Sequence, residues 1–237
     1  MIITIDGPVA TGKSTIAKKL AEEISFIFFD TGAMYRALTY AVLKHRIDIE
    51  QAEVLNNFLD QFQFDIKVIK RQRRYFLEGE DITDKIRYED VTEAVSRVSA
   101  NKTVRDKLVA LQQELASGVN AVFEGRDMGT IVFPNAALKI FLTGRDEVRA
   151  KRRYSELMSK YPERCQDLTI EKCLEEITKR DLYDSSRACS PLCQAKDAFV
   201  IDTSDLTIDE IVAKILEYKD SLKARGGFAT EHYSSEA

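Results

Sequence analysis

Residues 7–14 have the types and the order that bind the phosphates of a nucleotide. They match the pattern G-x-x-x-x-G-K-[ST] in full, and with the next threonine they form the expected ATP-binding segment: Gly7, Pro8, Val9, Ala10, Thr11, Gly12, Lys13, Ser14 and Thr15. Glycines allow successive backbone N–H groups to turn toward phosphate oxygens, and the start of a helix adds partial positive charge. We expect Lys13 to contact the γ-phosphate of ATP, the phosphoryl donor, and the Ser14 hydroxyl to help hold Mg²⁺.

The motifs that mark nucleotide-dependent switches are missing from the sequence. A signalling GTPase would add D-x-x-G and N-K-x-D, but no D-x-x-G occurs, and Val104 replaces the aspartate in the nearest N-K-x-D, at 101–104. Large ATPases need a longer chain and further modules. A small phosphotransferase is the remaining class, and a non-catalytic nucleotide-binding regulator is the alternative outside enzymes.

Arginines near the ends of the expected strands predict a second anion site. Arg36 follows the strand expected at 26–29, Arg126 follows the one expected at 121–124, and Arg105 lies on an intervening helix. Ligands of open α/β sheets bind beyond the carboxyl ends of the strands. A guanidinium group suits phosphate because its planar fork donates two parallel hydrogen bonds. We therefore expect a second phosphorylated ligand to face ATP.

A basic helix is expected at 144–158, with arginines spaced three to four residues apart and hence on one face. Its cations are Arg145, Arg149, Lys151, Arg152 and Arg153, and Arg180 and Arg187 flank the next loop. Each of them, taken alone, is more simply a solvated or ion-paired surface residue. Beside a phosphate-binding loop, Arg149, Arg152 and Arg153 become candidate catalytic residues on a lid that excludes water.

Two carboxylates, Asp127 and Asp184, lie among these arginines in the sequence. Either could bind a water of Mg²⁺ or a ribose hydroxyl, or orient an arginine. Because a phosphate acceptor is already anionic, the transfer requires no strong general base, and neither residue is assigned that role. Asp127 remains a candidate catalytic residue beside Lys13, Arg126 and the lid arginines.

Strands and helices alternate along most of the chain, which predicts a mainly parallel sheet with helices on both faces. Apolar runs favour strands at 1–6, 26–29, 121–124, 137–143 and 199–202, and helical spacing favours helices at 13–24, 32–44, 50–62, 88–99, 103–116, 144–158, 169–182 and 207–223. In the segment 64–88, apolar and polar residues alternate with the period of a half-buried antiparallel strand. We expect a small β insertion there, and a flexible tail at 226–237.

Composition limits the kinds of partner. The formal net charge of −4 argues against a nucleic-acid-binding surface, and the longest apolar runs are too short to cross a membrane. The N-terminus shows no signal-peptide pattern, so we expect a cytoplasmic protein. Four cysteines are expected to be free thiols, because no pair has C-x-x-C spacing and a cytosolic chain keeps its thiols reduced, with a metal clip as the lesser alternative: Cys165, Cys173, Cys189 and Cys193.

Four segments together resemble bacterial cytidylate kinases, the CMP and dCMP kinases among P-loop nucleoside monophosphate kinases. They are GPVATGKST, DTGAMYRAL, EGRDMGTIVFPNA and KRDLYDSSRACSPL, and the resemblance runs from Met1 to about Lys223. It implies an α/β P-loop kinase with a five-stranded parallel sheet, a small antiparallel β insertion in the monophosphate-binding region, and a short lid. The expected insertion at 64–88 agrees with this.

The resemblance also implies residue roles. Arg36, Arg105 and Arg126 would hold the phosphate of CMP, while Ser96 and Arg187 would help read the cytosine. Arg180 and Asp184 would lie near the sugar and the phosphates, Tyr35 and Asp127 would line the acceptor pocket, and Arg149, Arg152 and Arg153 would belong to the lid over ATP.

Three positions depart from the family pattern. Thr31 stands where serine is usual, so an added methyl group crowds the pocket and leaves the preference between CMP and dCMP open. Ser14 stands where many members have glycine, which should improve Mg²⁺ binding. Glu124 replaces a common aspartate, and its role is not assigned.

We therefore expect the reaction ATP + (d)CMP → ADP + (d)CDP with Mg²⁺, in pyrimidine nucleotide metabolism. The alternatives are another small P-loop kinase, acting on UMP, AMP or shikimate, and the regulator named above. One kinase domain is expected at 1–225: a core at about 1–30, 117–145 and 196–225, a monophosphate-binding region at about 31–116, and a lid at about 146–195. We expect a monomer, because the family is usually monomeric and the sequence shows no dimer signature.

Overall fold

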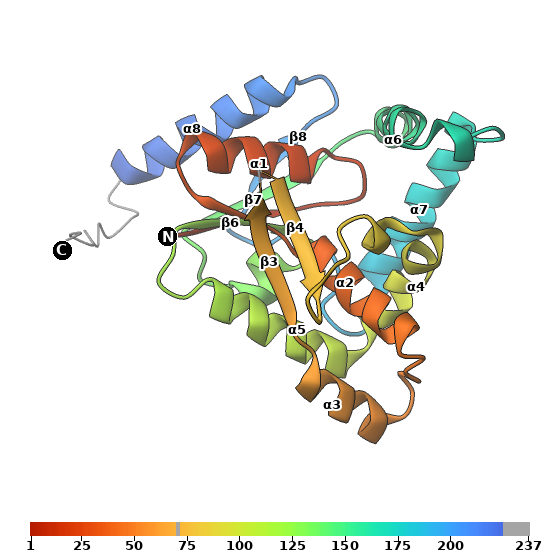
Figure 1. Ribbon diagram of the computed structural model, residues 1–237. Helices are drawn as coiled ribbons and strands as arrows, with labels where there is room; N and C mark the ends of the chain where they lie inside the picture. The colour runs from red at the N-terminus through yellow and green to blue at the C-terminus, as the bar shows by residue number, and fades with distance from the viewer. Residues whose placement is uncertain (70–71, 225–237) are drawn as a thin grey trace.

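A five-stranded parallel sheet forms the centre of the computed structural model, which describes residues 1–69 and 72–224 (Figure 1). The order of the strands is β2 (Ile27–Asp30), β6 (Ala121–Gly125), β1 (Ile2–Asp6), β7 (Leu138–Thr143) and β8 (Phe199–Asp202). Every neighbouring pair is parallel, which confirms the expected sheet. The carboxyl ends of the strands therefore meet at one edge. The tail expected at 226–237 lies outside the described residues.

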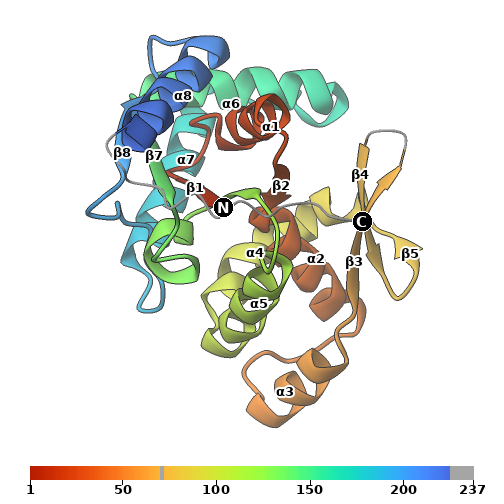
Figure 2. The same ribbon diagram turned by 90° about the vertical axis from the view of Figure 1, so that its left-hand side faces the viewer.

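Helices cover both faces of this sheet (Figure 2). On one face, α1 (Lys13–Glu23) and α8 (Ile208–Ala224) bury their apolar stripes against β1 and β7, with Ile16, Leu20 and Ile211 fully or almost fully buried. On the other face, α2 (Thr31–Lys44) and α5 (Lys102–Leu115) pack on β6. The strands are consequently mostly apolar, as expected of a parallel sheet with helices on both faces, and the charged residues Asp6 and Glu124 lie at or near their carboxyl ends.

Two more helices enlarge the layer beneath the sheet. α3 (Ala52–Gln61) and α4 (Glu89–Ala100) share an apolar cluster with α2 and α5. The side chain of Asn101 separates α4 from α5, because it accepts hydrogen bonds from the N–H groups of Thr103 and Val104 and so caps α5. A short 3₁₀ turn, Lys85–Arg87, precedes α4.

The expected β insertion is a three-stranded antiparallel sheet of β3 (Phe64–Ile69), β4 (Gln72–Leu77) and β5 (Glu80–Asp81). It stands beside the edge strand β2, where the guanidinium of Arg73 lies 4.6 Å from the centre of the Phe28 ring. Ile66 and Tyr75 join it to the apolar clusters beneath. The insertion is thus packed on the main domain.

The basic helix is α6 (Asp146–Lys160), which packs against α7 (Ile170–Ser186), and a 3₁₀ turn, Pro162–Arg164, lies between them. α7 runs four residues beyond the end expected at 182. Leu182 and Tyr183 are exposed, so the apolar periodicity stops while the helix continues. The short helical turn at Met128–Val132 also had no counterpart among the expected elements. Among the described residues, no helix is long and apolar enough to cross a membrane.

Candidate active site

The phosphate-binding loop connects β1 to α1 at the carboxyl edge of the sheet. Gly7 has a φ of +149°, and a Cβ at this position would meet the carbonyl oxygen of Leu142 at 2.2 Å. The close approach of the loop to β7 therefore requires glycine. Gly12, with a φ of +88°, precedes α1, whose first turn contains Lys13 and the exposed Ser14 and Thr15.

Lys13 points back over the loop. Its Nζ donates a hydrogen bond to the Pro8 carbonyl oxygen at 2.6 Å and lies 3.4 Å from the hydroxyl of Thr11. Burial, reinforced by the positive charge of Arg126, lowers the pKa of Lys13 to about 7. The charges of Glu124, Asp181 and Asp6 oppose this effect. Lys13 thus lies among charged groups of both signs at the carboxyl edge of the sheet.

Ser14 is joined to Glu124 at the end of β6. Its hydroxyl donates to Glu124 Oε1 at 2.6 Å. Burial, with the nearby charge of Asp30, raises the pKa of Glu124 to about 7. A hydroxyl and a carboxylate are the oxygen ligands that Mg²⁺ prefers, so these residues fit the expected ion. The described residues hold no cluster of three or more histidine, cysteine or acidic side chains that could bind a metal without the nucleotide.

Asp184 on α7 gathers three arginines. Arg126 Nε donates to its carboxylate at 3.0 Å, Arg180 Nε lies at 3.4 Å, and an Arg187 nitrogen lies at 3.9 Å. Burial opposes the charge of Asp184, but the three guanidinium groups outweigh it and lower the pKa of this carboxyl. Three cations on one carboxylate leave a net positive charge for a further anion.

Arg36 on α2 is a half-buried cation with uncharged hydrogen-bond partners. It donates to the Thr92 hydroxyl at 2.8 Å and to the Ile86 carbonyl oxygen at 3.3 Å. Burial and then the charges of three other arginines lower its pKa to about 10; they are Arg87, Arg180 and Arg153. This cluster joins arginines from α2, α6 and α7, as a phosphate site would.

Arg105 and Asp127 form a buried ion pair, and each side chain is 3% exposed. Arg105 also donates to the Ser99 carbonyl oxygen at 3.1 Å, and its guanidinium lies 5.3 Å from the centre of the Tyr35 ring. Arg105 Nε and the Tyr35 hydroxyl are buried without a hydrogen-bond partner. Because such atoms are costly to leave unsatisfied, they mark the place of a polar ligand. The half-buried Ser96 belongs to the same helix as Ser99.

The three candidate lid arginines differ in how far protein oxygens already bind their guanidinium groups. Arg149 donates to the carbonyl oxygens of Val9 and Gly144 and to the carboxylates of Asp146 and Asp181. Arg152 is bound to the hydroxyl and carbonyl oxygens of Thr203, at 2.9 and 2.5 Å. Arg153 is bonded to Glu156, yet its charge acts on Arg36.

Several residues of the site were not predicted from the sequence. Arg87 pairs with Asp30 and acts on Arg36, and Asp181 binds the backbone N–H of Val9 at 2.9 Å. The Asp6 carboxylate accepts hydrogen bonds from the backbone N–H groups of Met128 and Gly129 at 2.9 and 2.8 Å. Asp6 stands directly before the glycine motif, and this position was a signal in the sequence that could have identified it. The partners of Arg87 and Asp181 are remote in sequence, so no local signal indicated these two residues.

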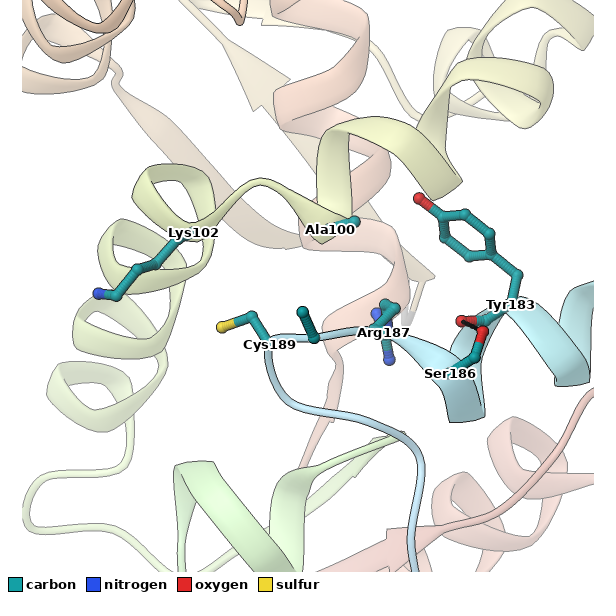
Figure 3. A pocket seen from close by; sticks show the side chains of 7 residues that line it. Ala100, Lys102, Tyr183, Ser186, Arg187 and Cys189 are labelled. Carbon is teal, nitrogen blue, oxygen red and sulfur yellow. Dashed lines mark hydrogen bonds between the residues drawn. The ribbon is translucent and has the colours of Figure 1, made fainter.

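A cavity of about 600 Å³ lies between the α4–α5 junction and the end of α7 (Figure 3). Its walls are Ala100, Lys102, Tyr183, Ser186, Arg187, Ala188 and Cys189. Arg187 lines the cavity and also lies 3.9 Å from Asp184, so the cavity adjoins the arginine cluster. All four thiols are free; Cys165 and Cys173 are buried, Cys189 is half-buried and Cys193 is exposed.

Thr31 contributes to the carboxyl edge of the sheet mainly through a hydrogen bond to the backbone of β6. Its buried hydroxyl donates to the Glu124 carbonyl oxygen at 2.7 Å, which fixes the start of α2 against the end of β6. The site thus has two groups of residues: one around Lys13 and Ser14, which we call the donor half because the sequence predicts ATP there, and one around Arg36, Arg126 and Asp184, which we call the acceptor half because the sequence predicts the second anion there.

Comparison with known proteins shows the family of the chain. The family model described as cytidylate kinase matches residues 3–221. The chain is 71% identical over 225 residues to the cytidylate kinase of Protochlamydia amoebophila, covering 95% of this chain and 99% of that protein. It is 47% identical to the cytidylate kinase of Ligilactobacillus salivarius (90% and 94% covered) and 45% identical to that of Bacillus subtilis (91% and 94% covered).

Solved structures of low identity share the fold alone. A shikimate kinase from Bacteroides thetaiotaomicron has a TM-score of 0.50 at 13% identity, with 93% of this chain and 98% of that chain covered. An uncharacterized protein from Eubacterium ventriosum has a TM-score of 0.51 at 15% identity, with the same coverage. These similarities support the P-loop kinase architecture.

Proposed function

The chain belongs to the cytidylate kinase family, and we propose that its site transfers the γ-phosphoryl group of ATP to the phosphate of CMP or dCMP. It is a phosphotransferase, with ATP as donor. One observation carries the assignment of the site: α7 binds the phosphate-binding loop through Asp181 and binds Arg126 through Asp184, so the loop and the arginine cluster lie along one helix. A phosphoryl group passing between two anions needs positive charge beside it.

On the donor side, the backbone N–H groups of residues 7–14 would cradle the phosphates of ATP, and Lys13 would follow the γ-phosphate. Ser14 would bind Mg²⁺, with Glu124 orienting its hydroxyl through the 2.6 Å hydrogen bond. The ion, when bound, neutralises charge on the phosphates. No general base is required, because the acceptor oxygen is already anionic.

On the acceptor side, the phosphate of CMP would be held by Arg36, Arg126 and Arg180, with Arg153 as the lid arginine nearest to it. Arg36 supports this role because its hydrogen-bond partners are uncharged, so its charge is free for the ligand. Asp184 would orient Arg126 and Arg180 and accept a hydrogen bond from the sugar, since one of its carboxylate oxygens is buried without a partner that meets hydrogen-bond criteria.

The pairing of Arg105 changes the role that we propose for it. Its charge is neutralised by Asp127, so it is a weaker phosphate ligand than Arg36. Together the pair offers donors and an acceptor, which match the ring carbonyl and the exocyclic amine of cytosine. Uracil carries a carbonyl where cytosine carries the amine, and would face the Asp127 carboxylate with an acceptor. Ser96, Arg187 and Tyr35 would complete this base subsite, beside the cavity of Figure 3.

Arg149 and Arg152 would act on the lid rather than on the phosphates, because protein oxygens already occupy their guanidinium groups. We propose that residues 146–195 form the lid, residues 31–116 bind the monophosphate, and the core comprises residues 1–30, 117–145 and 196–225. We also propose a monomeric enzyme of pyrimidine nucleotide metabolism. Its place would be the cytoplasm, where ATP and CMP are available.

The test is ADP release from Mg·ATP against CMP, dCMP, UMP, AMP, GMP and shikimate. Strong turnover with CMP and dCMP alone supports the proposal, and Arg126→Ala should lower kcat/KM for CMP by about a hundredfold or more. Turnover with another acceptor would keep the donor half and refute the base subsite. If none of the six compounds stimulates ADP release, the proposed catalysis is refuted and a nucleotide-binding regulator is favoured.

A further inference from the structure

The lid and the phosphate-binding loop are joined at one residue, Val9. Its N–H donates to Asp181 Oδ1 at 2.9 Å, and its carbonyl oxygen accepts from Arg149 at 2.8 Å. The same guanidinium nitrogen of Arg149 donates to Asp181 Oδ2 at 2.6 Å, which closes the network. Both backbone polar groups of Val9 are therefore held by side chains of α6 and α7.

Packing and charge reinforce this connection. The Val9 side chain packs against the small apolar cluster between α6 and α7, formed by Ala150, Cys173 and Ile177. The charge of Asp181 also raises the pKa of Lys13, against the larger effect of burial. Asp181 is thus part of the surroundings of the donor phosphates, although it is 172 residues away from Val9 in the sequence.

The same face of α7 carries the acceptor groups. Asp184 lies one turn beyond Asp181, and it binds Arg126 at 3.0 Å and gathers Arg180 and Arg187. Figure 1 shows α7 running from α6 toward α4, and contacts with both helices support this path. A displacement of this helix must therefore change the donor loop and the acceptor arginines together.

We propose that Asp181 is a positioning residue that couples the two nucleotide sites, so that ATP and CMP bind more tightly together than separately. The inference rests on the proposed function. CMP would fix α7 through Arg126, Arg180 and Asp184, and α7 would fix Val9 through Asp181. ATP then binds to a loop that is already ordered. Thermodynamic linkage requires that ATP increase the affinity for CMP by the same factor by which CMP increases the affinity for ATP.

The experiment measures the dissociation constant of CMP by calorimetry, with and without saturating Mg²⁺ and the β,γ-imido analogue of ATP. In the wild type we expect the analogue to tighten CMP binding about fivefold or more, and in Asp181→Asn less than about twofold. The asparagine keeps an acceptor for Val9 but turns an amide donor or a neutral oxygen toward Arg149. Asp181→Glu, which keeps the charge, should recover part of the coupling.

Asp146→Asn is the matched control. Asp146 binds the same guanidinium group at 2.6 Å, is more exposed than Asp181, and has no hydrogen bond to the loop. This variant should keep the wild-type coupling. Hydrogen exchange adds an independent readout: either ligand should slow exchange in α7 of the wild type, and the analogue should lose this effect in Asp181→Asn.

Equal coupling in the wild type and in Asp181→Asn would overturn the inference, and so would a wild type whose two sites bind independently. A wild type that binds neither CMP nor the ATP analogue would instead refute the proposed function. Because the coupling is a ratio, a change in the affinity for one ligand alone does not imitate the expected result.

Discussion

Burial disfavours the charged form of Lys13 as long as no phosphate is bound beside it. Its pKa of about 7 is well below the usual 10.5 of a lysine, first because of burial and then because of Arg126. At about pH 8 most Lys13 side chains are therefore neutral, and triphosphate binding raises the pKa again. We expect uptake of nearly one proton per Mg·ATP, measured by calorimetry in buffers with different ionisation enthalpies.

Glu124 titrates near the same pH, so it could contribute proton release when Mg²⁺ binds. At about pH 8 this carboxyl is mostly ionised, and the uptake by Lys13 should dominate. Lys13→Met is the control and should show no uptake. Uptake of equal size in that variant would assign the proton to another group.

Asp127 is the residue on which base discrimination should depend. Its carboxylate pairs with Arg105 and would accept a hydrogen bond from the exocyclic amine of cytosine. In Asp127→Asn the amide can turn a donor toward a uracil carbonyl. We expect kcat/KM for CMP to fall about tenfold to a hundredfold, and the ratio of CMP to UMP activity to fall at least about tenfold, since a single such hydrogen bond contributes about 1–3 kcal/mol.

Asp184→Asn is the comparison for this prediction. Asp184 is also a buried carboxylate of the acceptor half, but its shortest contacts are to Arg126 and Arg180, and Arg187 of the base subsite lies farther away, at 3.9 Å. Its replacement should reduce activity with every acceptor and change the CMP to UMP ratio much less than Asp127→Asn does. A ratio that falls equally in both variants would contradict the assignment of Asp127.

At the scale of elements, the turn from β1 into the phosphate-binding loop depends on the closeness of β7. A methyl group at Gly7 would meet the Leu142 carbonyl oxygen at 2.2 Å, so β1 or β7 must shift. We expect Gly7→Ala to lower the free energy of unfolding by roughly 1–3 kcal/mol and to raise the KM for ATP. Chemical denaturation and steady-state kinetics check the two effects.

Gly79→Ala provides the control for backbone conformation. Gly79 also has a positive φ, +82°, but a Cβ there would have no atom within 4 Å. Its replacement should cost only the backbone strain, roughly 1–2 kcal/mol, without an effect on ATP. An unchanged KM for ATP in Gly7→Ala would show that the loop tolerates the displaced strand.

At the scale of the whole molecule, Asp6 makes stability depend on pH. Burial raises its pKa to about 6, against the opposing hydrogen bonds from Gly129 and Met128. Because the folded state holds the proton more tightly than the unfolded chain, this contribution to stability is present at low pH and is lost as the pH rises through about 6. The unfolding free energy of the wild type minus that of Asp6→Asn should therefore decrease between about pH 5 and about pH 7.5.

Chemical denaturation at both pH values measures this difference. Asp6→Asn serves as the reference, because titrating groups remote from Asp6 are present in both proteins and their contributions cancel. Lys13 interacts with Asp6, so the same pair of measurements in the Lys13→Met background separates its contribution. A difference that stays constant, or that grows with pH, would contradict the raised pKa of Asp6.

Much of the fold was predictable because its signals are local. The ends of all five core strands were expected within one residue, and alternation in 64–88 predicted the small antiparallel sheet. The end of α7 was missed, since its last turn has exposed apolar side chains and Asp184 in that turn pairs with Arg126, which is distant in sequence.

The sequence by itself determined the donor half of the site, because the phosphate-binding loop is contiguous and its function lies mainly in the backbone. It also identified the arginines of the acceptor half. Only the tertiary structure decided which arginines are bound by oxygens of distant residues. Arg149 and Arg152 share a face with Arg153, but oxygens of Val9 and Thr203 occupy them. Spacing along a helix specifies a direction, whereas the charge available to a ligand depends on partners brought there by folding.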